Sequence, residues 1–306
     1  MAASLAQPPA QSRPLGIAAR LGATLSFALM AAMIKLAFEA GIGLVEIAFY
    51  RFAFGLPPLL AWMAATGNLG AWRTRRPLAH VARAAIGLTT MVMGFSALGY
   101  LPLAEATTIS FAAPLFSVIL SALVLAEPVG RHRWSAVALG FVGVTLVMQP
   151  GGTALPPAGL ALALGGALGV AAVTITIRQI GRTESTPTTV LWFTGLATLT
   201  LGLLMPLHGQ AHAPTEWLVL AAMGLAGGIG QLCLTASLRF APVSVVVPLD
   251  YVQLLWVVAL GWLIWSTQPP ATTWAGAAVI IGSGLYTLYR EHRLGREKPH
   301  RAGLEV

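Results

Sequence analysis

Ten apolar stretches follow one another along almost the whole chain, and each is close to the length that a helix needs to cross a bilayer. They lie near residues 16–38, 44–64, 79–99, 103–125, 133–149, 157–178, 187–206, 215–237, 242–264 and 272–289. A helix spans the hydrocarbon with about 20 apolar residues. Only 9% of the 306 residues are charged, against roughly 25% in soluble domains. The sequence therefore predicts an all-α integral membrane protein with ten transmembrane helices, of which the fifth is short.

Basic residues mark one side of this predicted bundle. If the N-terminus is cytoplasmic, 16 of the 18 Lys and Arg residues fall on or beside the inner face, and the exceptions are Lys35 and Arg51. The 16 are Arg13, Arg20, Arg73, Arg75, Arg76, Arg83, Arg131, Arg133, Arg178, Arg182, Arg239, Arg290, Arg293, Arg296, Lys298 and Arg301. The net charge of +8 thus reflects membrane orientation and not nucleic-acid binding. We expect a multi-pass protein of the bacterial inner membrane with both termini in the cytoplasm.

The second half of the chain repeats the first. A shift of 140 residues lays Pro102 on Pro242 and Trp134 on Trp274 within similar surroundings. Five spans per half is an odd number, so the two copies insert with opposite orientation. Inverted repeats are typical of secondary transporters, because two similar halves can exchange conformations around a central site. Gene duplication without such alternating access is the other interpretation.

The repeats define the expected organisation of the chain. Its parts are a cytoplasmic tail (1–15), a first five-helix repeat (16–149), a periplasmic connection (150–156), a second five-helix repeat (157–290) and a basic cytoplasmic tail (291–306), whose last four residues resemble a tag remnant.

Several short motifs, in order, resemble a known family. They are Ala97–Thr107, Pro114–Phe116, Ala126–Pro128 before Arg133, Gly140–Val144, Gly282–Tyr286, and the segment from Glu46 to Arg51. Over roughly residues 16–290 the chain resembles the EamA family of the drug/metabolite transporter superfamily. It departs from the pattern in the second copy, where Thr267 and Gln268 replace Glu127 and Pro128. The resemblance implies a ten-helix carrier of small metabolites, such as amino acids, riboflavin or S-adenosylmethionine. An exporter of aromatic or other neutral amino acids is the functional expectation.

The ninth predicted span contains the only aspartate of the chain, Asp250. At 1.5 Å per residue it lies roughly 12 Å from the inner face. Ionisable residues inside a membrane usually face a cavity or a partner. Asp250 is therefore a candidate for binding a substrate amino group or a proton. The alternative is that it caps the backbone group freed by Pro248, which is a candidate helix kink together with Pro114.

Four more ionisable residues occur near the outer ends of the first, second and fourth spans. Lys35 and Glu46 are expected at similar depth on antiparallel neighbours, where they can form a salt bridge. Glu105 lies at the same level, and Arg51 lies about 7 Å deeper than Glu46. This cluster is interpreted either as an outer gate or as a static brace. Glu105 and Asp250 are the candidate proton carriers, and both proton coupling and facilitated diffusion stay open.

A central cavity should hold the small-molecule substrate. The candidates for lining it are Tyr50, Trp192, Gln231, Asp250, Tyr251 and Trp256. Aromatic rings among them can stack on a planar substrate or simply pack between helices. Gly224 and Gly228 share one helix face and favour close helix packing.

Other function classes find little support in the sequence. All six histidines fall at or beyond predicted span ends, so we expect no metal site in the membrane core and no cofactor. Phosphate-binding loops and nucleophile-elbow motifs are absent from the sequence. An intramembrane enzyme and a channel stay as the alternatives to a carrier, and the oligomeric state is left open.

Overall fold

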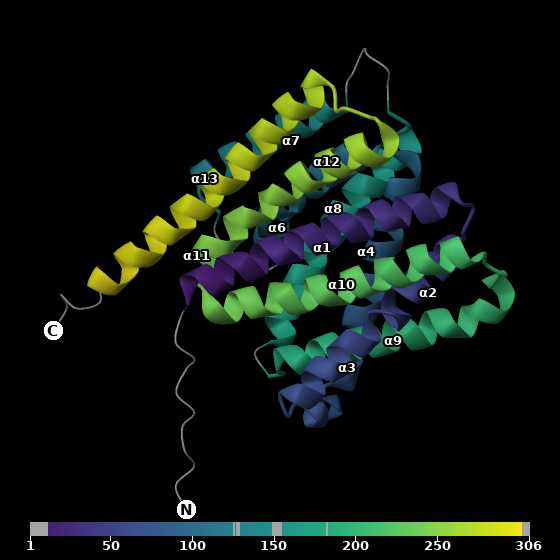
Figure 1. The fold of residues 1–306 in the computed structure, drawn as a ribbon. Helices are drawn as coiled ribbons and strands as arrows, with labels where there is room; N and C mark the ends of the chain where they lie inside the picture. The colour runs from purple at the N-terminus through teal and green to yellow at the C-terminus, as the bar shows by residue number, and fades with distance from the viewer. Residues whose placement is uncertain (1–11, 125, 127–128, 149–154, 182, 302–306) are drawn as a thin grey trace, which may run out of the picture.

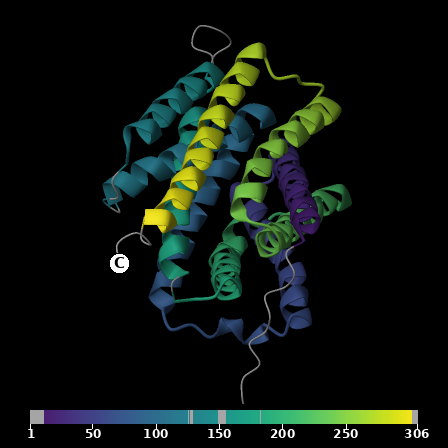
Figure 2. The same cartoon turned by 90° about the vertical axis from the view of Figure 1, so that its left-hand side faces the viewer.

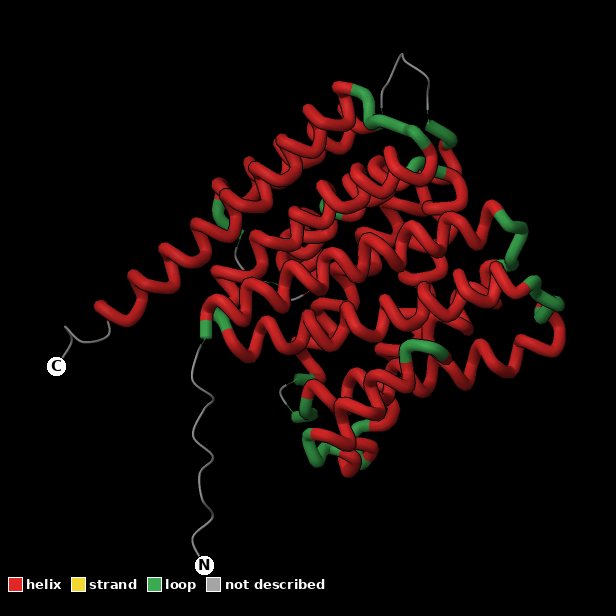
Figure 3. The backbone as a smooth tube through the Cα atoms, viewed as in Figure 1, coloured by secondary structure: helices red, strands yellow, loops and turns green. Residues whose placement is uncertain are grey.

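The computed structural model describes residues 12–124, 126, 129–148, 155–181 and 183–301, and every regular element in these ranges is a helix (Figure 3). The α-helices are α1 (Arg13–Glu39), α2 (Leu44–Ala53), α3 (Leu56–Ala65), α4 (Pro77–Tyr100), α5 (Leu103–Ser110), α6 (Ala113–Val124), α7 (Arg131–Val147), α8 (Pro157–Ile180), α9 (Thr186–His208), α10 (Pro214–Phe240), α11 (Val243–Val246), α12 (Gln253–Trp265) and α13 (Ala271–Arg301). Two 3₁₀ helices, η1 (Leu69–Trp72) and η2 (Val247–Val252), complete the set. The predicted all-α membrane fold is confirmed.

Nine helical segments of the described chain are long and apolar enough to cross a membrane. They are α1, α2 with α3, α4, α5 with α6, α8, α9, α10, η2 with α12, and α13 as far as Arg290. The fifth predicted span corresponds to α7, which has only 17 residues and is not among the nine. Because α7 packs along α13 (Figure 1), it nevertheless belongs to the same bundle.

A shift of 140 residues carries the helices of the first half onto those of the second. α6 begins at Ala113 and α12 at Gln253, and α7 and α13 begin at Arg131 and Ala271. The packing has the same symmetry. Helix α1 of the first half packs along α10 of the second half, and their counterparts α8 and α4 also pack along each other. The counterparts α2 and α9 also pack against each other. Figure 1 shows α1 beside α10, and the turned view in Figure 2 places α12 between α13, in yellow, and α1, in purple. The helix arrangement thus has the internal symmetry expected of two related repeats.

Three of the spans are interrupted within their length. The second breaks between α2 and α3, and the fourth breaks between α5 and α6, where Pro114 is the second residue of α6. The ninth span begins as α11, continues as η2 with Pro248 at its second position, and becomes α12. Proline lacks the N–H that would continue a preceding helix. Both prolines therefore stand at points where a helix starts anew inside the bundle.

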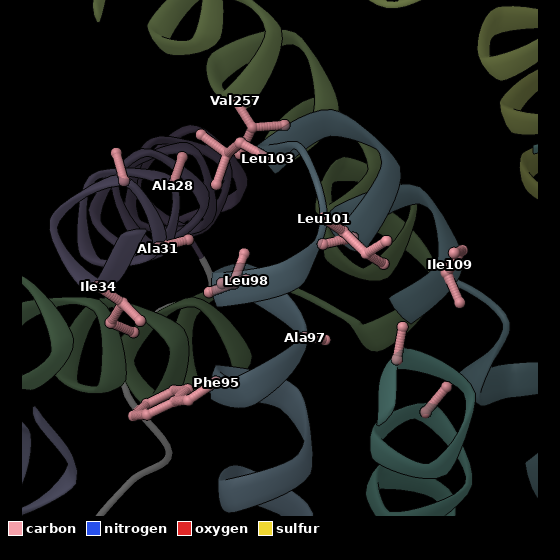
Figure 4. Close-up of a cluster of buried hydrophobic side chains, with 14 of the residues drawn as sticks. Ala28, Ala31, Ile34, Phe95, Ala97, Leu98, Leu101, Leu103, Ile109 and Val257 are labelled. Atoms are coloured by element: carbon pink, nitrogen blue, oxygen red, sulfur yellow. The ribbon is translucent and has the colours of Figure 1, made fainter. Parts of the chain in front are cut away.

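Small and aliphatic side chains fill the interior between α1, α4, α5 and α12. Figure 4 shows Ala28 and Ala31 of α1 together with Leu98, Leu103 and Val257, which belong to one buried cluster. Lipid tails are as apolar as these side chains, so close packing, and not removal from water, stabilises such contacts. Alanines suit this arrangement because they let helix backbones approach.

Two glycines of α10 allow it to approach the break between α2 and α3. A Cβ atom at Gly224 would lie 2.5 Å from the Cβ of Phe54, and one at Gly228 would lie 2.8 Å from the carbonyl oxygen of Gly55. Glycine is the residue that permits such close backbone approach. The contact holds the end of α2, and with it Arg51, against α10.

Some predicted features lie outside the described residues. They include Glu127 and Pro128 of the family-like loop, most of the 150–156 connection, most of the N-terminal tail and the last residues of the C-terminal tail. The repeat boundaries and the membrane orientation stay predictions.

Candidate functional site

The two ends of the bundle differ in charge. The end at which α1 begins carries the arginine-rich segments 73–76 and 131–133, and we call it the basic end. The other end, where α1 finishes and α8 begins, is called the opposite end.

A cavity of about 510 Å³ lies between α2, α4, α8, α9 and α10, so that both repeats contribute to its walls. Its deep part is lined by Arg51, Arg83, Phe193, Thr194 and Gln231. Its rim at the basic end includes Gly181, Glu184, Leu238 and Arg239. Of these rim residues, three are exposed and Glu184 is partly buried. We call this space the arginine cavity, and its size suits a small organic ligand.

The two arginines of the deep wall are buried, and neither pairs with a carboxylate of the residues that the structure describes. Arg51 is 9% exposed and Arg83 is 8% exposed. The Nε of Arg51 and the Nε and Nη1 of Arg83 are buried and make no hydrogen bond within the described chain. Charged residues inside a membrane bundle that lack a protein partner are expected to face a water-filled or ligand-filled space. Here both side chains line the same cavity.

Aromatic rings hold these guanidinium groups in place. The Cζ of Arg83 lies 3.9 Å from the ring centroid of Phe193, and the Cζ of Arg51 lies 4.7 Å from that of Phe52. Such cation–π contacts are favourable and restrict the guanidinium plane. Gly87 provides room for Arg83, because a Cβ atom there would overlap both the guanidinium and Phe193.

A second cavity of about 380 Å³ adjoins the first, since Arg83 and Phe193 line both. It lies between α1, α4, α5 and α8, and its walls include Met30, Met91 and Phe95. We call it the apolar cavity. The arrangement offers one space lined by three arginines beside one whose walls are mostly apolar, and Arg83 stands between the two.

At the basic end, Asp250 is held by Arg20 of α1. The Nε and Nη2 atoms of Arg20 each donate to one carboxylate oxygen of Asp250, both at a distance of 2.5 Å. The Nη1 atom of Arg20 donates to the hydroxyl of Ser237 at 3.3 Å. Arg20 is buried, while the Asp250 side chain is 41% exposed. The structure therefore places the candidate proton or amine site in an ion pair that joins α1, η2 and α10.

Glu184 stands at the rim of the arginine cavity. It accepts hydrogen bonds from the Thr74 hydroxyl at 2.9 Å and the Arg75 backbone N–H at 3.0 Å, and its other oxygen lies 3.9 Å from His80 Nε2. Burial raises the pKa of this carboxyl, but the two hydrogen bonds and the neighbouring charges of His80 and Arg75 bring the pKa below its usual 4.5. Glu184 is thus ionised at neutral pH and engaged by its loop neighbours.

Lys35 is engaged at the opposite end, but not with Glu46. Its Nζ lies 3.7 Å from Glu39 and donates to the carbonyl oxygens of Leu98 and Leu101. Glu39 in turn accepts from Trp265 Nε1 at 2.7 Å. This set of contacts ties α1 to α12 and to the turn before α5.

Glu46 and Glu105 make separate contacts at the same end. Glu46 accepts from the Gln210 backbone N–H at 2.8 Å and lies 3.0 Å from His212 Nε2. Glu105 accepts from the hydroxyl of Thr273 at 3.1 Å. The expected Lys35–Glu46 bridge is wrong in this conformation, because each residue has a nearer partner. All three carboxylates, those of Glu39, Glu46 and Glu105, join the first repeat to the second.

The predicted cavity residues are dispersed. Gln231 lines the arginine cavity, and Tyr251 lines a further space of about 610 Å³ together with Pro114. Three aromatic candidates pack elsewhere: Tyr50 against Phe54 and Trp217, Trp192 on His80 with its Nε1 donating to Trp72, and Trp256 against the main buried cluster. The structure does not bring Tyr50, Trp192, Gln231 and Tyr251 into one shared wall.

Arg83 and Phe193 are site residues that do not stand out in the sequence. The positive-inside pattern places Arg83 at the inner face, yet it is the seventh residue of α4, roughly 9 Å along the helix axis, and it is buried. A charged residue this far inside an apolar helix was the signal that could have separated it from the loop arginines. No group of three metal-binding side chains occurs within the described chain.

The comparisons with known proteins agree with this architecture. The sequence profile of the EamA-like transporter family matches the chain twice, over residues 14–149 and 157–289. The chain belongs to the EamA-like transporter family. This EamA-like chain is 27% identical to the riboflavin transporter of Vibrio cholerae over 281 residues, covering 91% of the chain and 94% of that protein. It is 28% identical to the pseudopaline exporter of Pseudomonas aeruginosa over 267 residues, covering 87% and 93%.

A crystal structure with 20% sequence identity shares the fold of this EamA-like protein, with a TM-score of 0.60 over 89% of the chain and 98% of the other chain. Family and relatives together identify a multi-pass small-molecule transporter of the drug/metabolite superfamily.

Proposed function

We propose that this EamA-like protein is a secondary transporter of the bacterial cytoplasmic membrane that works by alternating access. The observation that carries the proposal is the arginine cavity, which lies between the two repeats and reaches the basic end. At the opposite end, Glu39, Glu46 and Glu105 join one repeat to the other. Transport then requires that these contacts open while the rim at the basic end closes.

The basic end is the cytoplasmic end in this proposal, and both termini lie in the cytoplasm. Its support is the positive-inside distribution of arginines. The conformation described here is accordingly inward-open.

We propose amino acids, aromatic or other neutral, as the cargo and export as the direction. The arginine cavity supports this cargo because it combines charged and polar groups with a phenylalanine ring. An exporter among the relatives supports the direction.

Riboflavin is the second candidate cargo, and a riboflavin transporter among the relatives favours it. S-adenosylmethionine, the other metabolite that the family resemblance implies, carries a sulfonium cation. In the arginine cavity, such a cation would lie among three arginines and one glutamate, Glu184, which is already hydrogen-bonded to its loop neighbours. The cavity charge therefore disfavours it.

Proton coupling would act through Glu105 or Asp250. A proton on Asp250 would weaken its ion pair with Arg20, which joins α1 to η2. Uptake into proteoliposomes that does not respond to an imposed pH gradient would instead support facilitated diffusion.

Counterflow in proteoliposomes tests the function and the cargo together. Vesicles preloaded with unlabelled amino acid should accumulate the labelled amino acid transiently, and riboflavin and S-adenosylmethionine complete the panel. Failure of every amino acid would reject the proposed cargo. Flux beyond carrier rates would indicate a channel, and a changed product would indicate an enzyme.

A further inference from the structure

Arg51 and Arg83 bury two positive charges in one cavity, and among the described residues no carboxylate pairs with either. The acid nearest to Arg51 in the sequence, Glu46, uses its Oε1 atom to bind Gln210 and His212. The acid of the cavity wall, Glu184, accepts from Thr74 and Arg75. A buried charge is costly unless it is paired and hydrogen-bonded. In the described conformation, the free-energy cost of burying these two charges is therefore not offset by a carboxylate of the described chain.

The two guanidinium groups are fixed in position before any ligand arrives. Phe52 and Phe193, the rings beneath them, touch edge to face with centroids 5.3 Å apart. Arg51 also lies against α10 at Gly227, where a Cβ atom would come within 3.3 Å of its Nε. Groups held in this way lose little freedom when a ligand binds, which favours affinity.

The shape of the neighbouring space defines the rest of the ligand. Beyond Arg83 and Phe193 lies the apolar cavity, with Met30, Met91 and Phe95 in its walls. Methionines adapt to ligands of different shape and contact aromatic rings favourably. A molecule with an anionic head and an apolar body fits the two spaces together.

We infer that Arg51 and Arg83 bind the carboxylate of the transported molecule while its apolar part enters the apolar cavity. The planar guanidinium fork matches a carboxylate in geometry and charge. This inference rests on the proposed function and narrows its substrate class to amphipathic carboxylates.

Binding to the purified full-length protein tests the inference without requiring transport. The probes are phenylalanine and benzoate, their amides phenylalaninamide and benzamide, which lack the carboxylate, and phenyl phosphate as a second anion. We expect the two carboxylates to raise the melting temperature and the amides to leave it unchanged. Arg51→Gln and Arg83→Gln should weaken carboxylate binding by roughly 10- to 100-fold, the range for a lost charged hydrogen bond. Arg73→Gln, at an exposed arginine outside the cavity, is the matched control and should bind as the wild type does.

A further variant separates ligand binding from a purely structural role. Arg83→Met removes a buried charge that pairs with no carboxylate in the described part of the chain, and the methionine keeps an apolar contact with Phe193, so the ligand-free protein should be at least as stable as the wild type. If Arg83→Met instead melts earlier and still binds carboxylates, Arg83 is a structural residue and the inference is wrong.

The other outcomes are equally decisive. Equal shifts with acid and amide, binding of phenyl phosphate but not benzoate, or no shift with any probe would each overturn the inference. If carboxylates bind in an arginine-dependent way but no amino acid shows counterflow, the inference stands and the proposed amino-acid cargo is rejected.

Discussion

Phe52 and Phe193 meet edge to face, with ring centroids 5.3 Å and ring planes 87° apart, and each ring lies beneath a buried arginine. Phe52 belongs to the first repeat and Phe193 to the second. Arg51 and Arg83 both belong to the first repeat, so a relative movement of the repeats would shift the Phe193 ring away from Arg83. The pair links the conformation of the protein to the geometry of its charged cavity.

Phe193 should position Arg83 for ligand binding. Phe193→Leu removes the ring but keeps an apolar side chain, and a cation–π contact is worth about 0.5–2 kcal/mol. We expect phenylalanine to bind roughly 2- to 30-fold more weakly to this variant. Phe116→Leu, at a ring that contacts Phe141 outside both cavities, is the control. Titration of the melting temperature with ligand measures both, and equal affinities in the two variants would contradict the role.

The Arg20–Asp250 pair should stabilise the described conformation. Asp250→Asn leaves the buried Arg20 without its anionic partner, and loss of a charged hydrogen bond costs about 1.5–3 kcal/mol. The partial exposure of Asp250 places the expected cost at the lower end of that range. Thermal unfolding in detergent measures it. The exchange Arg20→Asp with Asp250→Arg should recover part of the loss, and a double variant no better than the singles would argue against the pair.

Glu184 should contribute stability that depends on pH. Its pKa in the folded protein is lowered from the usual 4.5. A carboxyl with a lowered folded-state pKa stabilises the fold above its unfolded pKa, and the contribution disappears as the pH falls through the folded value. The melting temperature of the wild type should exceed that of Glu184→Gln between pH 5.5 and 8, and the difference should shrink below about pH 4.5. A difference independent of pH would show that the charge is not responsible.

Close packing of α10 on the α2–α3 break should be sensitive to one methyl group. Gly228→Ala would place a Cβ atom 2.8 Å from the Gly55 carbonyl oxygen. Overpacking of this kind typically costs about 1–3 kcal/mol. Gly195→Ala in α9 is the matched control, because nothing lies within 4 Å of its added Cβ. We expect a lower melting temperature only for the variant at Gly228.

Much of the fold could be predicted from the sequence because the bilayer imposes a simple constraint. Helices must satisfy their own backbone hydrogen bonds in lipid, so apolar length alone located the spans. The Pro102 and Pro242 turns revealed the repeat, which the helix starts of both halves reproduce. The short fifth span was also visible in the sequence, and α7 is short in the structure.

The site was harder to predict because it depends on which side chains meet across helices. Similar depth predicts that Lys35 pairs with Glu46. In the structure Glu46 instead binds Gln210 and His212 of the loop before α10, and Lys35 pairs with Glu39, one helical turn further along α1. Arg83 was hidden among the loop arginines because the positive-inside rule counts charges without asking whether they are buried. Sequence periodicity alone does not supply that information.

Alternating access requires the opposite end to open, so locking that end with a crosslink should stop transport. In a Cys233→Ala background, cysteines at positions 39 and 265 replace the Glu39 and Trp265 side chains that meet at 2.7 Å. A short, reducible bifunctional thiol reagent joins them, and amino-acid counterflow is measured before crosslinking, after it and after reduction, with both single-cysteine variants as controls. We expect counterflow to stop on crosslinking and to return on reduction. Unchanged counterflow in the crosslinked protein would contradict alternating access, because the opposite end would then not need to open.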